Sequence, residues 1–122
     1  MGKKKILIIE DEPNLAQSLS IRLEDAGYKT QIANNGVTGW EILQKMKPGL
    51  VLLDVMLPGM DGYAVCRLAK NNKKTKDIPI IMLTAKSLMK EVDQGFSSGA
   101  DAYIMKPYDP KILYNKISEL IG

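Results

Sequence analysis

Residues 50–54, Leu-Val-Leu-Leu-Asp, decide the fold, because four consecutive apolar side chains there end on an acid. A strand that is buried on both faces needs such a continuous apolar run, whereas a strand with one exposed face alternates apolar and polar residues. Further short apolar runs lie at 6–9, 30–33, 78–83 and 102–105. The chain is therefore expected to contain five short strands, and the most continuous runs are expected to be buried on both faces.

The segments between these strands have helical spacing of their apolar residues. In the third segment this spacing places Val65, Leu68 and Ala69 inward. An alternation of strand and helix predicts an α/β fold, a three-layer α/β/α sandwich with a five-stranded parallel sheet and five helices. The helices are expected over 13–26, 37–47, 61–71, 87–96 and from 110 onward.

Composition narrows the class of protein. The chain has 122 residues, 45% of them apolar and 25% charged, which suits one domain over 1–122. No apolar run approaches the roughly 18 residues of a membrane span, and the net charge of +3 does not argue for direct binding of nucleic acid. The single Cys66 cannot form an intramolecular disulfide, so we expect a cytoplasmic protein without membrane contact. The absence of histidine excludes histidine-based catalysis.

Polar residues follow four of the predicted strands. In parallel sheets of this kind, functional groups collect where the strands end, so these side chains are expected to share one edge. Crowded carboxylates repel one another unless a cation lies between them, and Mg²⁺ prefers such oxygen ligands. A carboxylate, a divalent ion, a hydroxyl and an amine together suit phosphoryl transfer to an acid. The residues are Glu10, Asp11, Glu12, Asp54, Thr84 and Lys106.

Taken alone, each of these residues has an ordinary structural explanation. Asp11 and Glu12 would favour the N-terminal dipole of the first helix, and Asp54 would suit a turn. Thr84 would cap the fourth helix, and Lys106 would be a surface lysine. Their joint arrival at one edge of the sheet favours the functional interpretation.

Four motifs in order carry a family resemblance. They are Ile-Leu-Ile-Ile-Glu-Asp-Glu-Pro (6–13), Leu-Leu-Asp-Val-Met-Leu-Pro-Gly-Met-Asp-Gly (52–62), Met-Leu-Thr-Ala (82–85) and Gly-Ala-Asp-Ala-Tyr-Ile-Met-Lys-Pro (99–107). Together they resemble the receiver domain of bacterial response regulators, the chemotaxis-regulator-like members of two-component systems. The resemblance implies the flavodoxin-like fold with strand order 2-1-3-4-5. It also implies that a histidine kinase phosphorylates Asp54.

The same resemblance implies a metal site. Asp11 and Asp54 would bind Mg²⁺ through their carboxylates, with Mn²⁺ as an alternative ion. Met56 would contribute its backbone carbonyl, and Glu10 would act through water. Lys106 would pair first with the Asp54 carboxylate and then with its phosphoryl group.

The resemblance also assigns a switch. Thr84 would turn its hydroxyl toward a phosphoryl oxygen, the backbone N–H of Ala85 would donate to another, and Tyr103 would rotate inward. The Lys106–Pro107 peptide bond would be cis. The surface formed by the fourth helix, fifth strand and fifth helix would then change its preference for partners.

The resemblance thus predicts a phosphoacceptor signalling domain that catalyses only its own phosphorylation and dephosphorylation. A sensor histidine kinase or phosphotransfer protein would supply the phosphoryl group. A downstream effector protein or a missing output domain would receive the signal, and the chain would be a monomer or a phosphorylation-dependent dimer.

Three other classes compete with this interpretation. A flavin-binding electron carrier would need a phosphate cradle after the first strand, where acids 10–12 would repel phosphate. A Mg²⁺-dependent phosphohydrolase usually carries a second acid two residues past its nucleophile, where this chain has Met56. An interaction module that works without phosphorylation normally lacks part of the acid and lysine set.

Two residues away from this edge also carry expectations. Gly39 falls inside the second helix, at a cost near 1 kcal/mol relative to alanine. Cys66 is expected to be a half-buried apolar residue of the third helix.

Overall fold

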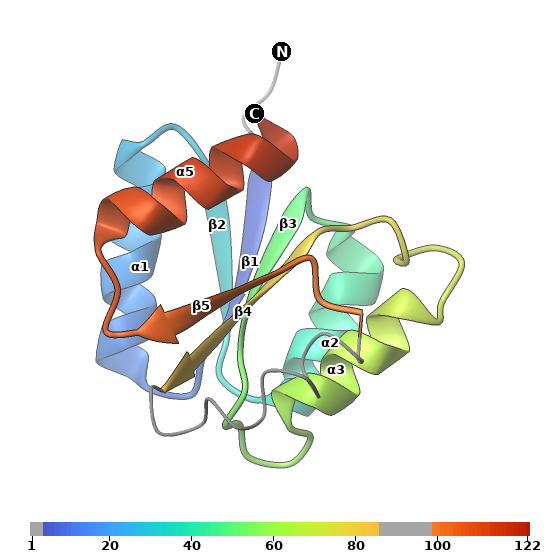
Figure 1. Cartoon of the computed structure of the whole chain (residues 1–122). Helices are drawn as coiled ribbons and strands as arrows, with labels where there is room; N and C mark the ends of the chain where they lie inside the picture. The colour runs from blue at the N-terminus through green and yellow to red at the C-terminus, as the bar shows by residue number, and fades with distance from the viewer. Residues whose placement is uncertain (1–3, 86–98) are drawn as a thin grey trace.

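The computed structural model describes residues 4–85 and 99–122, and a single parallel sheet forms the centre of this part of the chain (Figure 1). The strands lie in the order β2-β1-β3-β4-β5, which confirms the predicted α/β fold and strand order. Their bounds are β1 Lys5–Ile9, β2 Lys29–Ala33, β3 Leu50–Asp54, β4 Ile80–Ala85 and β5 Ala102–Lys106.

Helices cover both faces of the sheet, with α1 and α5 on one side and α2 and α3 on the other (Figure 1). The fourth predicted helix, over 87–96, lies outside the described residues. The helices are α1 Pro13–Asp25, α2 Gly36–Met46, α3 Gly62–Lys70 and α5 Pro110–Ile121.

The first and third strands are buried on both faces, as their continuous apolar runs predict. Alternate side chains of one strand therefore enter two separate cores. Ile6 and Ile8 pack toward α1 and α5, whereas Leu7 and Ile9 pack with the residues of α2 and α3. The strands that lead to the site are consequently packed on both faces of the sheet.

Each described helix begins at a side chain that caps it. Glu12, Asn35, Asp61 and Asp109 all have extended backbones, and each accepts a hydrogen bond from an N–H of the first turn. Such caps satisfy backbone donors that have no partner inside the helix. They fix the residue at which each of these helices begins.

Three expectations about local structure were wrong. Strand β4 begins at Ile80 rather than at 78, because the Ile78 N–H donates to Thr75 in the preceding turn and Pro79 has no N–H to donate. Leu68 is 40% exposed rather than inward, and Cys66 is fully buried rather than half-buried. The inward face of α3 is therefore rotated relative to the prediction.

Both ends of the described chain lie together, at the edge of the sheet where the strands begin (Figure 1). The Lys4 ammonium donates to the Ile121 carbonyl, which ties the start of the sheet to the end of α5. Among the described residues, no helix is both long enough and apolar enough to cross a membrane.

Candidate functional site

Three carboxylates meet where β1 and β3 end, and we call Glu10, Asp11 and Asp54 the acidic cluster. Each offers an oxygen that lies within 4.8 Å of the others. Glu10 is 2% exposed and Asp54 is 7% exposed, whereas Asp11 is open to solvent. The sheet therefore brings together the acids that the sequence places after its first and third strands.

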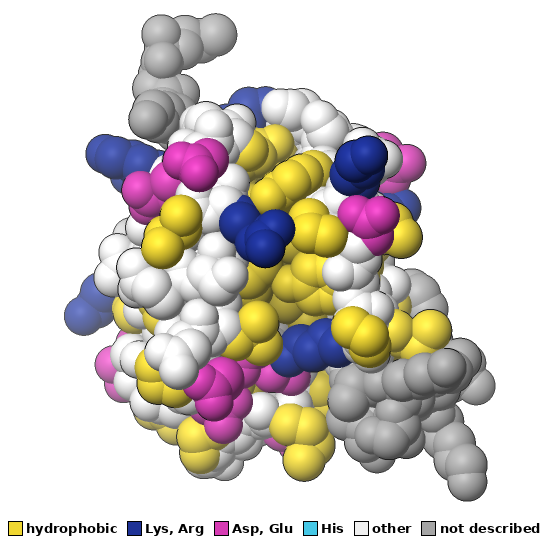
Figure 2. Space-filling view, turned by 90° about the vertical axis from the view of Figure 1, so that its left-hand side faces the viewer, with side chains coloured by type: hydrophobic (Ala, Val, Ile, Leu, Met, Phe, Trp, Pro, Cys, Tyr) yellow, Lys and Arg dark blue, Asp and Glu magenta, His cyan; other side chains and the backbone are white. Residues whose placement is uncertain are grey.

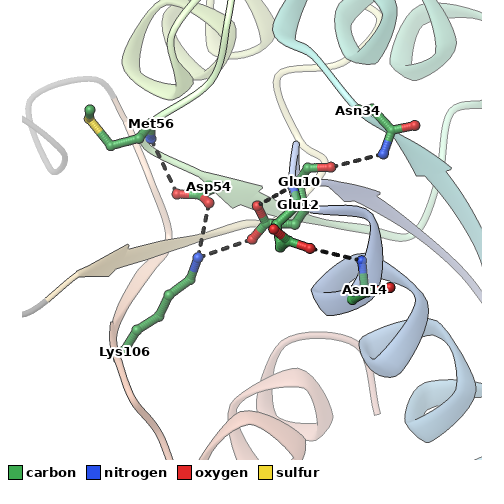
Figure 3. A network of polar contacts seen from close by, with 7 residues as sticks. All are labelled: Glu10, Glu12, Asn14, Asn34, Asp54, Met56 and Lys106. Carbon is green, nitrogen blue, oxygen red and sulfur yellow. Dashed lines mark hydrogen bonds and ion pairs between the residues drawn. The ribbon is translucent and has the colours of Figure 1, made fainter.

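Lys106 reaches this cluster from the end of β5 (Figure 3). Its Nζ donates to Glu10 Oε1 at 3.0 Å and to Asp54 Oδ2 at 2.9 Å. The ammonium thus bridges the two buried carboxylates. The peptide bond that follows it, Lys106–Pro107, is cis.

Backbone N–H groups hold the remaining carboxylate oxygens. The Glu12 N–H donates to Glu10 Oε2 at 3.1 Å, and the Met56 N–H donates to Asp54 Oδ1 at 3.2 Å (Figure 3). Each buried acid therefore has one oxygen on the lysine and the other on the backbone. This arrangement fixes the orientation of both carboxylates.

Burial and neighbouring charges both shift the pKa values of Glu10 and Lys106. Burial raises the pKa of the Glu10 carboxyl from 4.5 to about 7, and the neighbouring Asp54 adds to the rise, while the Glu12 N–H and Lys106 lower it. Burial lowers the pKa of the Lys106 ammonium, but its bonds to Asp54 and Glu10 outweigh burial and the net shift is upward. Lys106 is therefore charged at neutral pH, and one lysine leaves the acids only partly neutralised.

This donor set fits a hard divalent cation. The cluster offers carboxylate oxygens from three residues, one of them exposed, against a single ammonium. The pKa of Glu10 is raised chiefly by burial, with the neighbouring Asp54 adding to the rise. Mg²⁺ binds such oxygens and keeps part of its water shell, which the exposed side of Asp11 leaves room for.

Glu12, the third acid after β1, has a structural role and is not part of the acidic cluster. Its Oε1 accepts a hydrogen bond from the Asn14 N–H at 3.1 Å at the start of α1 (Figure 3). Glu12 therefore lies at the start of the first helix, where the structural alternative for it expected an acid, while Asp11 joins the acidic cluster.

The connection after Asp54 folds back against that residue. The Val55 N–H bonds to the Leu83 carbonyl, and the Gly62 N–H bonds to the Val55 carbonyl. A Cβ on Gly62 would lie 2.3 Å from the Asp54 carbonyl oxygen, so only glycine fits at this approach. The start of α3 is thereby held directly behind the acidic cluster.

Strand β4 brings Thr84 and Ala85 to the same edge of the sheet. Thr84 follows Leu83, the register partner of Asp54, and its side chain is fully buried. Ala85 is the register partner of Lys106. The backbone of these residues therefore ends beside the lysine that holds Asp54.

Tyr103 is half-buried on β5, and its hydroxyl lies 2.9 Å from the Tyr63 hydroxyl on α3. Tyr63 is 4% exposed. The sequence interpretation singled out Tyr103 and missed Tyr63. A helical face formed by Tyr63, Cys66 and Ala69 is the signal that places this tyrosine inward.

A groove of about 430 Å³ lies next to Lys106, between α1, α5 and the connection that joins β5 to α5. Figure 2 shows hydrophobic side chains gathered in this hollow, with basic side chains at its border and acidic side chains beside it. Lys106 lines one wall of the groove while its Nζ bonds the two acids. The lysine therefore connects the acidic cluster to the α1–α5 face.

A doubly wound parallel sheet with an acidic cluster and a bridging lysine at its carboxyl edge defines the class of phosphoacceptor switches. The chain belongs to the response regulator receiver domain family, whose model matches residues 6–118. It is accordingly a signalling domain of two-component systems that works through phosphorylation.

Relatives support this membership. The chain is 41% identical over 117 residues to the DNA-binding dual master transcriptional regulator RpaA of Synechocystis sp., covering 96% of this chain and 48% of that protein. It is also 41% identical to the DNA-binding response regulator MtrA of Mycolicibacterium smegmatis, covering 94% of this chain and 49% of that protein. The chain thus spans about half the length of these relatives.

Solved structures agree with the fold. The signal receiver domain of a signal transduction histidine kinase from Syntrophus aciditrophicus has a TM-score of 0.91 at 37% identity, covering 97% of this chain and 89% of that one. The receiver domain of sensor histidine kinase PA1611 from Pseudomonas aeruginosa has a TM-score of 0.91 at 26% identity, covering 99% of both chains. The latter structure has a magnesium ion in its active site cleft.

Proposed function

We propose that Asp54 is the phosphoacceptor of this domain. The observation that carries the proposal is the bridge from Lys106 to Asp54 and Glu10, beside the exposed carboxylate of Asp11. In this reaction an oxygen of the Asp54 carboxylate attacks phosphorus, and the bond from phosphorus to the donor atom breaks. The domain would catalyse this step and the later hydrolysis by itself.

The metal ligands we propose are Asp11, Asp54 and the backbone carbonyl of Met56, with Glu10 acting through water. Mg²⁺ bound there, or Mn²⁺ in its place, would supply positive charge to the oxygens of the transferring phosphoryl group. The chain's own residues do the positioning. The Met56 N–H orients the Asp54 carboxylate. The Lys106 ammonium, which already bonds this carboxylate, would balance the negative charge of the phosphoryl group.

The conformational switch we propose uses residues of β4 and β5, the two strands that follow Asp54 in the sheet order. The Thr84 hydroxyl and the Ala85 N–H would each bond a phosphoryl oxygen, and Tyr103 would follow the movement of Thr84. The face that includes β5 and α5 would then change its partner. Phosphorylation acts in this scheme by biasing an existing equilibrium between two states.

The partners follow from this assignment. A sensor histidine kinase or a phosphotransfer protein would supply the phosphoryl group. Because RpaA and MtrA are DNA-binding regulators of about twice this length, an output domain in a longer protein is the recipient we favour over a separate effector. Residues 1–122 would act as one cytoplasmic unit, as a monomer or as a dimer formed on phosphorylation.

The direct test is incubation with Mg²⁺ and a small phosphodonor, followed by measurement of the intact mass. We expect the native chain to gain one phosphoryl group and Asp54→Asn to gain none. Asp25→Asn, which changes an exposed aspartate at the end of α1, is the matched control and should be phosphorylated normally. An adduct on both the native chain and Asp54→Asn, or on neither, would overturn the assignment.

A further inference from the structure

The hydrogen bond between Tyr63 and Tyr103 joins two segments that are both anchored at Asp54. Tyr63 follows Gly62, whose N–H bonds to the Val55 carbonyl directly after Asp54. Tyr103 lies three residues before Lys106, whose ammonium bonds the Asp54 carboxylate. The 2.9 Å contact between the two hydroxyls therefore closes a ring of contacts around the acceptor.

The side chains of Tyr63 and Tyr103 differ in how deeply they are buried. Tyr63 is 4% exposed and lies in the first turn of a capped helix, so its ring has a fixed place relative to Asp54. Tyr103 is half-buried on β5, the last strand of the sheet order, and packs at the border of the core on the α2 and α3 side. The buried member of the pair is thus able to determine the position of the more exposed one.

We infer that Tyr63 is a positioning residue whose hydroxyl holds the ring of Tyr103 in its half-buried orientation, which is the inward orientation of the proposed switch. The inference rests on the proposed function in one respect, namely that the orientation of Tyr103 reports phosphorylation of Asp54. A hydroxyl pair of this kind stabilises one orientation modestly, so its removal should change a two-state population by about 2- to 10-fold. Tyr63 would therefore set the balance of the switch without touching the phosphoryl group.

The variant Tyr63→Phe tests this inference, because it keeps the ring and removes only the hydroxyl. In protein grown with fluorotyrosine, the resonance of Tyr103 is identified by its loss in Tyr103→Phe. We expect a soluble paramagnetic reagent to broaden the Tyr103 resonance more strongly in Tyr63→Phe than in the native chain. Tyr28→Phe changes a half-buried ring on the other face of the sheet and is the matched control.

A second measurement connects the pair to the acceptor. We expect Tyr63→Phe to weaken binding of beryllofluoride with Mg²⁺, a mimic of the phosphoryl group, by about 2- to 10-fold, and to have no further effect in a Tyr103→Phe background. An unchanged Tyr103 resonance in Tyr63→Phe, or an equal loss of binding in both backgrounds, overturns the inference. If the native chain binds no beryllofluoride, the proposed function fails, while the fluorine measurement still decides the role of Tyr63.

Discussion

Glu10 is the residue whose chemistry depends most on its surroundings. Because its pKa in the folded chain is raised from 4.5 to about 7, folding favours the protonated carboxyl. The stability that this group contributes is fully present below pH 4.5 and is lost as the pH rises through 7. Each unit of difference in pKa corresponds to about 1.4 kcal/mol.

We therefore expect the free energy of unfolding of the metal-free protein to fall between pH 4.5 and 7, and Glu10→Gln to remove that fall. Urea denaturation across this pH range measures the effect. Glu41→Gln, which changes an exposed acid of α2, should keep the native slope. The same slope in Glu10→Gln and in the native chain would contradict the prediction.

Met56 lies two residues past Asp54 and is 63% exposed, so its side chain stands open to solvent at the acidic cluster. We propose that its apolar bulk hinders the water that hydrolyses the phosphorylated acceptor. Met56→Asn should then shorten the lifetime of the phosphoryl group several-fold, as followed by intact mass over time after removal of the phosphodonor. An unchanged rate of loss would refute this role.

At the residue scale, the sequence predicted which side chains collect at the carboxyl edge, because their types and spacing follow the strand ends. It did not predict that Glu12 caps α1 or that Tyr63 contacts Tyr103. Both facts depend on where a side chain points after packing. A contact between residues 40 positions apart leaves no periodic signal.

Among the elements, α3 contacts the backbone of Asp54 closely through Gly62. Gly62→Ala would place a methyl group against the Asp54 carbonyl at 2.3 Å, so the loop must shift. We expect a loss of about 1–3 kcal/mol in the free energy of unfolding, measured by urea denaturation. Gly49→Ala is the control, because a Cβ there lies no closer than 3.4 Å to the Lys5 carbonyl oxygen. Equal stability of the two variants would count against this account.

Element types and order were predictable because apolar runs and helical spacing report burial directly. Boundaries and the rotation of a helix were less predictable, as Ile78 and Leu68 show. Gly39, which is costly in a helix on propensity alone, has a packing reason. A Cβ at that position would lie 2.7 Å from the Ile9 side chain, so the glycine lets α2 approach β1.

The whole molecule should be stabilised by a divalent cation, since binding to the folded chain alone shifts the folding equilibrium. At free Mg²⁺ about 100-fold above its dissociation constant, the gain is about 2.7 kcal/mol. We expect thermal unfolding to shift upward with Mg²⁺ in the native chain and in Asp25→Asn, and much less in Asp11→Asn. A full shift in Asp11→Asn would show that the acidic cluster is not where the ion binds.

The position of the chain ends has a consequence for modular architecture. Lys4 and Ile121 meet at the edge where the strands begin, whereas Asp54 lies at the edge where they end. A polypeptide spliced onto either end would thus emerge on the far side of the sheet from the acceptor. The domain is consequently suited to insertion into longer proteins, since neighbouring modules can be exchanged without obstructing the entrance to the acidic cluster.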